Sequence, residues 1–282
     1  MTRAMCRTNN SFLADGYCVI PDFIKADELS LLSRAVDAVL IQTTHPGMSR
    51  PGNDLAPLRW SDEVVTLILR SADRLNRLAA AIAAPDLKWL SAYVSTKRPC
   101  TPPLCWHQDW WGWDHALSFG RPAPQVAVLI YLSETSRKNG ALRILPGSHR
   151  TSCDLHASLP EPHSPSASSL SVDHPAMGDH AKQVTLGLRA GDAVVIDYRL
   201  LHGTHANENL ARRDCVLLSF IPDWAKFPNE LKAHVRGHPA LPTADEMVEA
   251  TRKPYSDVFP RFAGQPVDIA INRVPPPSFA IV

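Results

Sequence analysis

The sequence lacks several features that would assign it to a familiar class. Its six cysteines stand at positions 6, 18, 100, 105, 153 and 215. None of them forms a Cys-x-x-Cys pair, which argues against structural zinc and favours buried free thiols in a reducing cytoplasm. No run of about 18 apolar residues occurs, so we expect no transmembrane helix. The first 13 residues contain no apolar core of the kind found in secretion signals.

The sequence also lacks an excess of either positive or negative charge. The chain has 29 Lys and Arg against 28 Asp and Glu, a formal net charge of +1, and no basic block. A nucleic acid or an acidic membrane held mainly by charge is therefore not an expected partner. Hydrophobic residues make up 45% of the 282 residues, which suffices for a packed core. The composition predicts a cytoplasmic protein with a small-molecule ligand, and it leaves the oligomeric state open.

The N-terminal part of the chain shows mainly helical patterns. Tyr17–Ile20 predicts a short strand, and the next apolar residues recur at helical spacing after the acidic pair Asp27 and Glu28. A second helix is expected from an N-cap at Ser61 as far as Pro85, which cannot continue it.

From about residue 88 the pattern changes to short apolar segments separated by Pro and Gly. They predict strands at 87–94, 125–132, 141–145, 183–188, 193–197 and 215–221. Such strands favour an antiparallel sandwich or barrel. We expect one domain over 1–282, with a helical part at 12–90, a core at 88–222 and a wrapping tail at 223–282. Residues 151–182, rich in Ser, Pro and His, are either disordered or a functional lid.

The chemistry starts at Trp106-His107-Gln108-Asp109. In a strand, residues i and i+2 face the same side, so His107 and Asp109 can reach one metal ion. An imidazole and a carboxylate are two members of the 2-His-1-carboxylate triad of non-haem Fe(II) oxygenases. With 12 His in the chain, however, one such pair alone is weak evidence.

The strongest candidate for the second imidazole is His202, which follows the apolar strand at 193–197. Arg213 lies 11 residues further on, at the start of another strand. A guanidinium there can hold the far carboxylate of a dicarboxylate in a bidentate manner.

Four blocks together resemble the phytanoyl-CoA dioxygenase (PhyH) family of Fe(II)/2-oxoglutarate-dependent oxygenases. They are Phe12–Tyr17, Trp106–Asp109, Asn139–His149 and His202–Arg213. The blocks occur in the family's order and spacing. The resemblance implies a mainly β (α+β) fold, a cupin-like double-stranded β-helix or jelly roll with helices packed on one sheet.

The resemblance also implies a set of ligands. His107, Asp109 and His202 would bind Fe(II), and Arg213 would pair with the distal carboxylate of 2-oxoglutarate. O2 would be the second cosubstrate. Further contacts to 2-oxoglutarate fall on four residues: Thr204, Trp113, Ser95 and Lys97. Relatives that halogenate have lost the carboxylate, so the presence of Asp109 favours hydroxylation or a related two-electron oxidation.

Two neighbouring choices stay open at this point. The second metal block ends in His205, where the family usually has a small residue, and His205 is an alternative ligand to His202. Arg212 competes with Arg213, because successive strand residues face opposite ways and only one of them can point inward. The step of 11 residues favours the pair His202 and Arg213.

Four of the seven Trp gather at 106, 110, 111 and 113. Core packing explains some of them, while Trp110 and Trp111, just past the metal block, are candidates for the substrate pocket. The expected activity is hydroxylation or other oxidation of a small metabolite, in secondary metabolism, with release of succinate and CO2. The alternatives are a catalytically silent binding module and a metal-dependent, non-oxidative enzyme on the same barrel.

Overall fold

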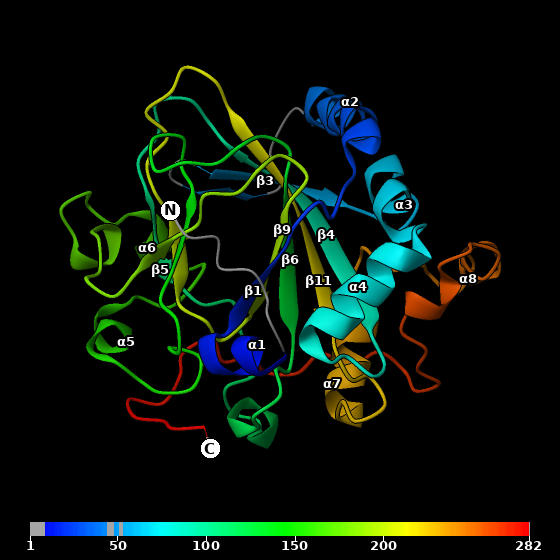
Figure 1. Ribbon diagram of the computed structural model, residues 1–282. Coiled ribbons are helices and arrows are strands. Elements are labelled where there is room, and N and C mark those ends of the chain that lie inside the picture. The colour runs from blue at the N-terminus through cyan, green and yellow to red at the C-terminus, as the bar shows by residue number, and fades with distance from the viewer. Residues whose placement is uncertain (1–8, 44–47, 51–52, 282) are drawn as a thin grey trace.

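The computed structural model describes residues 9–43, 48–50 and 53–281, and it contains two antiparallel sheets (Figure 1). The larger sheet has, in spatial order, β1 (Tyr17–Ile20), β9 (Ala193–Asp197), β6 (Val126–Tyr131), β11 (Arg213–Ile221), β4 (Lys88–Lys97), β3 (Asn53–Leu58) and β2 (Met48–Arg50). The smaller sheet has β5 (Leu104–His107), β10 (His202–Thr204), β7 (Leu142–Ile144) and β8 (Val184–Thr185). This is the jelly roll that the sequence predicts.

The larger sheet is buried on both faces, and the alternation of side chains along β6 shows how. Val126, Val128 and Ile130 join the core on the side of the helices. Ala127, Leu129 and Tyr131 point the other way, into the core between the two sheets. Because successive strand residues face opposite sides, a strand buried on both faces is apolar throughout. The interior between the sheets is where the functional residues lie.

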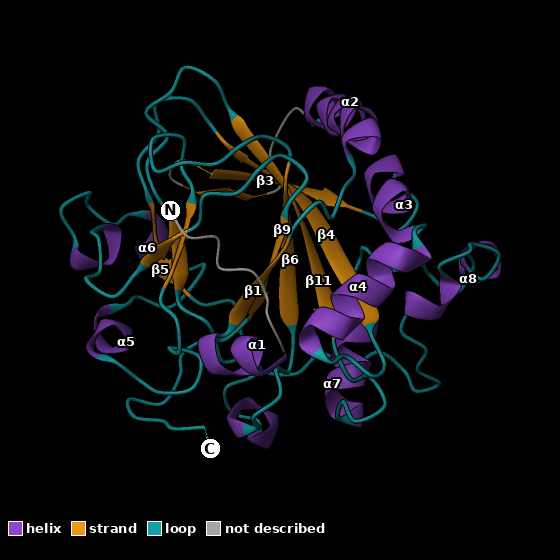
Figure 2. Ribbon diagram, viewed as in Figure 1, coloured by secondary structure: helices purple, strands orange, loops and turns teal. Residues whose placement is uncertain are grey.

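Helices cover the outer face of the larger sheet, as Figure 2 shows. They are α2 (Ala26–Gln42), α3 (Glu63–Leu69) and α4 (Ala72–Ile82). The prediction of one continuous second helix after Ser61 is wrong, because the helix is interrupted between Leu69 and Ala72. Ser71 caps α4 by accepting a hydrogen bond from Arg74 N, and the Arg74 guanidinium donates to carbonyls at the end of α3. These contacts satisfy one N–H at the start of α4 and two carbonyls at the end of α3.

The predicted strands differ from the observed ones mainly at weakly patterned segments. The strand expected at 183–188 is reduced to β8, and β2 and β3 were not expected from any apolar pattern. β3 carries Pro57, which lacks a backbone donor, and it pairs with β4 all the same.

The remaining segments wrap around the sheets. Residues 151–182 form α5 (Asp154–Ser158), α6 (Pro165–Ser168) and a 3-10 turn, η2 (Pro175–Met177), beside β5 (Figure 1). Beyond β11 come α7 (Asn229–Arg236), α8 (Met247–Ala250) and η3 (Ser256–Val258). Two further short helices are α1 (Asn9–Asp15) and η1 (Ala116–Phe119). Within the described residues, no helix has the length and apolar character needed to cross a membrane.

Candidate active site

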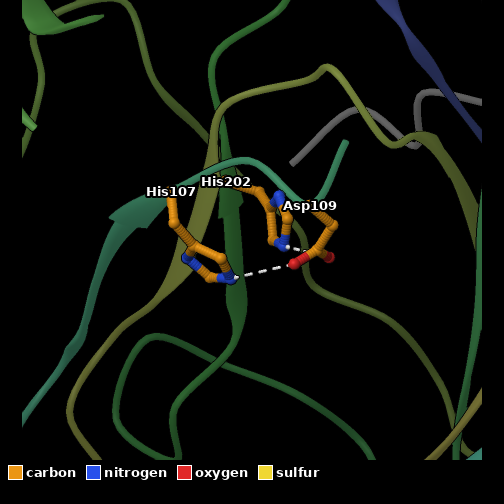
Figure 3. A group of neighbouring side chains, drawn as sticks. All are labelled: His107, Asp109 and His202. Atoms are coloured by element: carbon orange, nitrogen blue, oxygen red, sulfur yellow. Dashed lines mark ion pairs between the residues drawn. The ribbon is translucent and has the colours of Figure 1, made fainter. Parts of the chain in front are cut away.

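Three side chains predicted as metal ligands lie together between the sheets (Figure 3). His107 ends β5 and His202 begins β10, and the two residues are direct partners in the antiparallel register. Their ring centroids are 4.2 Å apart. One ligand atom each from His107, Asp109 and His202 lie within 4.8 Å of one another, which is close enough to surround one ion.

Asp109 reaches this group in a different way from the one expected. β5 ends at His107, so Asp109 does not share a strand with it. The backbone N–H groups of Asp109 and Trp110 instead both donate to the carbonyl of Tyr198, at 2.8 and 2.9 Å. This turn of the chain brings the carboxylate back towards both imidazoles.

The hydrogen bonds of the two imidazoles decide which nitrogen is available. Nδ1 of His107 donates to Cys105 O at 2.9 Å, and Nδ1 of His202 donates to Leu200 O at 3.0 Å. A backbone carbonyl fixes the proton on Nδ1 and leaves the Nε2 lone pair as the ligand. His107 Nε2 lies 3.8 Å from Asp109 Oδ1, and His202 Nε2 lies 3.5 Å from Oδ2 (Figure 3).

The carboxylate is held in its charged form. Burial acts to raise the pKa of Asp109, but a hydrogen bond from His163 and the neighbouring His202 and His107 imidazoles outweigh it. The resulting pKa lies well below the ordinary value of 3.8. Because a metal ligand must be deprotonated, this environment keeps Asp109 ready for an ion at neutral pH.

A cavity of about 700 Å³ opens from the triad. Its wall includes His107, Asp109 and His202, and it extends past Arg213 on β11 and Trp111. Cavities that hold small ligands usually measure roughly 300–1,000 Å³, so this one has room for a small molecule beside a cosubstrate.

Three of the residues expected to contact 2-oxoglutarate line this cavity: Arg213, Thr204 and Ser95. Arg213 is 2% exposed, stands over the ring of Tyr131, and has an Nε without a hydrogen-bond partner among the described residues. A buried donor without a partner costs free energy unless a ligand satisfies it. Arg212, the competing residue, forms solvent-facing ion pairs with Asp37 and Asp214.

Lys97 and Trp113 lie elsewhere, and neither belongs to the cavity wall. Lys97 is buried and its Nζ donates to Pro102 O at 2.6 Å. Burial and the nearby Arg213 and Arg143 lower the pKa of Lys97 to about 7. Trp113 packs against Phe279, with ring centroids 5.0 Å apart. The structure therefore gives neither residue a place beside Arg213 in the cavity.

The other tryptophans of the cluster divide between core and cavity. Trp111 lines the cavity, donates to Gln125 Oε1, and lies 5.1 Å from the His234 ring. Trp110 is fully buried and donates to Ser118 Oγ outside the cavity wall. Of the two tryptophans expected at the pocket, only Trp111 reaches it in the structure.

His205 belongs to another environment. Its Nε2 lies 2.8 Å from Thr185 Oγ1, and its Nδ1 faces Asp179 at 3.7 Å. Burial lowers the pKa of His205 to about 4. It is absent from the group of ligand atoms at the triad, so of the two candidates His202 and His205 it is His202 that lies at Asp109.

Several residues of the cavity wall were not found from the sequence. His163 comes from the 151–182 segment, Asn53 from β3 and His234 from α7. Asn53 Nδ2 donates to Ser95 Oγ at 3.0 Å, which fixes that hydroxyl beside Arg213. These contacts join distant parts of the chain, and no local sequence pattern marks them.

Comparison with known proteins decides the family. The model of the phytanoyl-CoA dioxygenase (PhyH) family matches residues 12–215. The chain belongs to the PhyH family. As a PhyH protein it is an Fe(II)- and 2-oxoglutarate-dependent oxygenase that acts on small molecules and uses O2.

Relatives named as dioxygenases agree with this membership. A probable alpha-ketoglutarate-dependent hypophosphite dioxygenase of Stutzerimonas stutzeri is 24% identical over 223 residues, which cover 74% of this chain and 76% of the relative. An ectoine dioxygenase of Nocardia farcinica is 32% identical over 240 residues, which cover 75% of this chain and 76% of the relative.

Solved structures share the fold. HygX from Streptomyces hygroscopicus, with nickel, 2-oxoglutarate and hygromycin B bound, has a TM-score of 0.57 and 21% identity, and covers 79% of this chain and 88% of its own. The epimerase SnoN from nogalamycin biosynthesis has a TM-score of 0.56 and 21% identity, and the match covers 76% of this chain and 79% of the SnoN chain.

The residues of the PhyH cavity fit the cofactors of the family. Two imidazole nitrogens and a carboxylate are the donor set of non-haem Fe(II) sites that leave positions open for substrates. The buried Arg213 with its unsatisfied Nε fits the far end of a dicarboxylate.

Proposed function

We propose that this PhyH protein hydroxylates, or otherwise oxidises, a small biosynthetic intermediate, with release of succinate and CO2. The observation that carries the proposal is the triad and Arg213 on the wall of one cavity. Fe(II) with 2-oxoglutarate and O2 supplies the oxidant when bound. The protein binds these groups, orients them and excludes water.

In this proposal His107, Asp109 and His202 hold the metal. The bonds from Nδ1 to backbone carbonyls orient both imidazoles, so that Nε2 points to the ion. The strand register that pairs His107 with His202 sets the spacing of these two ligands. Asp109, kept ionised by its surroundings, supplies the negative charge.

Arg213 binds the distal carboxylate of 2-oxoglutarate. The guanidinium fork matches a carboxylate in two parallel hydrogen bonds, and burial excludes water that would compete for them. Thr204 and Ser95 lie on the same wall and contribute hydroxyl groups. Trp113 and Lys97, also expected at the cosubstrate, would act from behind the wall, with Lys97 adding positive charge near Arg213.

The substrate occupies the part of the cavity beside Trp111. Trp111, Val235 and Ile271 provide apolar contacts there, and Gln125 and Tyr198 provide polar ones. Such a mixed wall suits a compact molecule with both apolar and hydroxyl or amide groups. HygX, which holds hygromycin B, and SnoN, from nogalamycin biosynthesis, support a natural-product substrate for this fold.

The test is turnover of 2-oxoglutarate to succinate by the purified protein with Fe(II) and O2, followed by a screen of metabolites for stimulated turnover. His107→Ala, Asp109→Ala and His202→Ala should each abolish succinate formation and metal binding. His205→Ala is the matched control, because it removes an imidazole from the same stretch of chain outside the triad, and it should leave metal bound. If the unaltered protein neither binds metal nor forms succinate, the silent-module alternative replaces this proposal.

A further inference from the structure

The 151–182 segment reaches the cavity through a single side chain. Among the described residues of that segment, only His163 belongs to the cavity wall. Its Nε2 lies 3.0 Å from Asp109 Oδ1, and its ring meets that of His107 edge to face, with centroids 5.8 Å apart. The side chains of His163 and Asp109 are each 18% exposed. A residue 54 positions further along the chain thus contacts a triad member directly.

His163 contacts the ligand Asp109 and is not itself a member of the triad. In the described part of the chain, the group of ligand atoms that all lie within 4.8 Å of one another contains His107, Asp109 and His202 alone. His163 Nε2 lies 3.0 Å from Oδ1, which His107 Nε2 faces at 3.8 Å, whereas His202 faces Oδ2. The geometry is that of an outer partner, which holds one carboxylate oxygen while the other remains for the ion.

The backbone around His163 holds the ring in this position. His163 has a φ of +65°, a left-handed conformation that is uncommon outside glycine. Pro162 on one side is buried, and Ser164 on the other caps α6 by accepting from Ala167 N. A backbone in this region persists where neighbouring contacts hold it, and such positions gather at functional sites.

The ends of the segment are attached to the barrel independently of His163. Near the start, Leu155 packs with Trp106 and Leu201. Near the end, Arg143 donates to the carbonyls of Met177 and Gly178, at 3.0 and 2.6 Å. Leu159 and Leu170, on either side of His163, also pack against the cluster of Cys105 and Met177. The contact with Asp109 adds an attachment directly at the metal site.

We propose that His163 is a positioning residue that donates a hydrogen bond to Asp109 and thereby fastens the 151–182 segment over the metal centre. This inference rests on the proposed role of Asp109 as a ligand. The bond orients the carboxylate for the ion. An ion that fixes Asp109 in turn stabilises the contact with His163, because coupling between two sites is reciprocal. Metal binding and closure of the segment are thus linked.

The experiment uses the full chain, with Mn(II) as the probe and without substrate. His163→Gly removes the ring and suits the positive φ, so the backbone is not strained. His163→Gln keeps an N–H donor of similar reach. We measure the Mn(II) dissociation constant by calorimetry and the hydrogen exchange of residues 151–182 with and without Mn(II).

In the unaltered protein, Mn(II) should slow hydrogen exchange in the segment. His163→Gly should weaken Mn(II) binding by about 10- to 100-fold, as loss of outer partners usually does, and should abolish the slowing. His163→Gln should restore part of both effects. His180→Ala, which removes a histidine of the same segment outside the cavity wall, should change neither.

Two results would overturn the inference, and they have different meanings. If His163→Gly binds Mn(II) as tightly as the unaltered protein and shows the same metal-dependent protection, His163 has no positioning role, and the proposed function stands. If the unaltered protein does not bind Mn(II) at all, the assignment of the triad fails and the role of His163 fails with it.

Discussion

At the scale of single residues, the site depends on which atoms each side chain leaves for a ligand. His107 and His202 use Nδ1 for backbone carbonyls and keep Nε2 for the ion. Arg213 is buried and has an Nε without a partner in the described part of the chain. Neighbouring residues of the same type, His205 and Arg212, have their own partners outside the cavity wall. Residue identity alone therefore does not define the site.

Arg213→Lys should raise the KM for 2-oxoglutarate. Lysine keeps the charge but loses the fork that binds a carboxylate through two hydrogen bonds. Hydrogen bonds to charged groups contribute about 1.5–3 kcal/mol, so we expect an increase of about 10- to 100-fold. Steady-state assays of succinate at varied 2-oxoglutarate measure it. Arg212→Lys, at an exposed ion pair, should leave the KM unchanged; equal KM values for both variants would contradict the role of Arg213.

Lys97→Met should stabilise the protein at and below neutral pH. Burial lowers the pKa of Lys97 to about 7, from an ordinary value of 10.5. The unfolded chain thus binds more protons than the folded one between these values, and the stability of the unaltered protein rises with pH across them. The advantage of Met should be largest below pH 7 and shrink above it.

Denaturant unfolding at several pH values measures the effect of Lys97→Met, and an advantage that does not depend on pH would contradict it. The same variant tests the expected contact with 2-oxoglutarate. If Lys97 adds to the positive field beside Arg213, the KM for 2-oxoglutarate should rise in Lys97→Met.

At the scale of elements, close approach of β5 and β10 sets the distance between the two histidines. Gly203 lies between His202 and Thr204 on β10. A Cβ at Gly203 would stand 2.8 Å from Leu104 O and 3.1 Å from Cys105 O, both backbone atoms of β5. Only a residue without a side chain lets the strands come together at this point.

Gly203→Ala should separate β5 from β10 and disturb the triad. Overpacking of this kind costs about 1–3 kcal/mol of unfolding free energy, and Mn(II) affinity should fall as His107 moves away from His202. Thermal unfolding and Mn(II) titration measure both effects. Gly187→Ala is the matched control, because a Cβ at Gly187 would lie 3.7 Å from Thr135 O, an ordinary van der Waals distance. Unchanged metal affinity in Gly203→Ala would show that the strand spacing is not critical.

The elements also show how far the sequence could lead. The spacing of His107, Asp109, His202 and Arg213 predicted four residues that the fold brings to one cavity. Which side chains after His107 face the cavity was harder to predict from the sequence. β5 ends at His107, so the alternation of side chains along a strand does not apply beyond it. Beyond β5, Trp110 and Trp113 are packed in the core, and Trp111 lines the cavity. Contacts such as His163 with Asp109 depend on the tertiary fold alone.

At the scale of the whole molecule, buried histidines make the fold sensitive to acid. Burial lowers the pKa of both His156 and His205 to about 4, from 6.5. These groups are neutral in the folded state at neutral pH, and the unfolded chain takes up protons first as the pH falls. Their contribution to stability is present above pH 6.5 and is lost towards pH 4.

The free energy of unfolding should therefore decrease between about pH 7 and about pH 5. In His205→Gln, which keeps a side chain that can hydrogen-bond Thr185, the decrease should be smaller. Denaturant unfolding at the two pH values measures the difference. His180→Gln, at a partly exposed turn, should behave like the unaltered protein, and an identical decrease in His205→Gln would refute the assignment.

The family match ends at residue 215, within β11, while the cavity wall continues on Leu217, α7 and the tail. The triad and Arg213 lie before that point, whereas the wall beside Trp111 draws on both sides of it, with Gln125 and Tyr198 before and Val235 and Ile271 beyond. Changes in the sequence beyond residue 215 can therefore alter the cavity wall without altering the metal ligands. A chimera that exchanges α7 and the tail, joined after β11, should therefore keep the metal ligands and change only one side of the cavity wall.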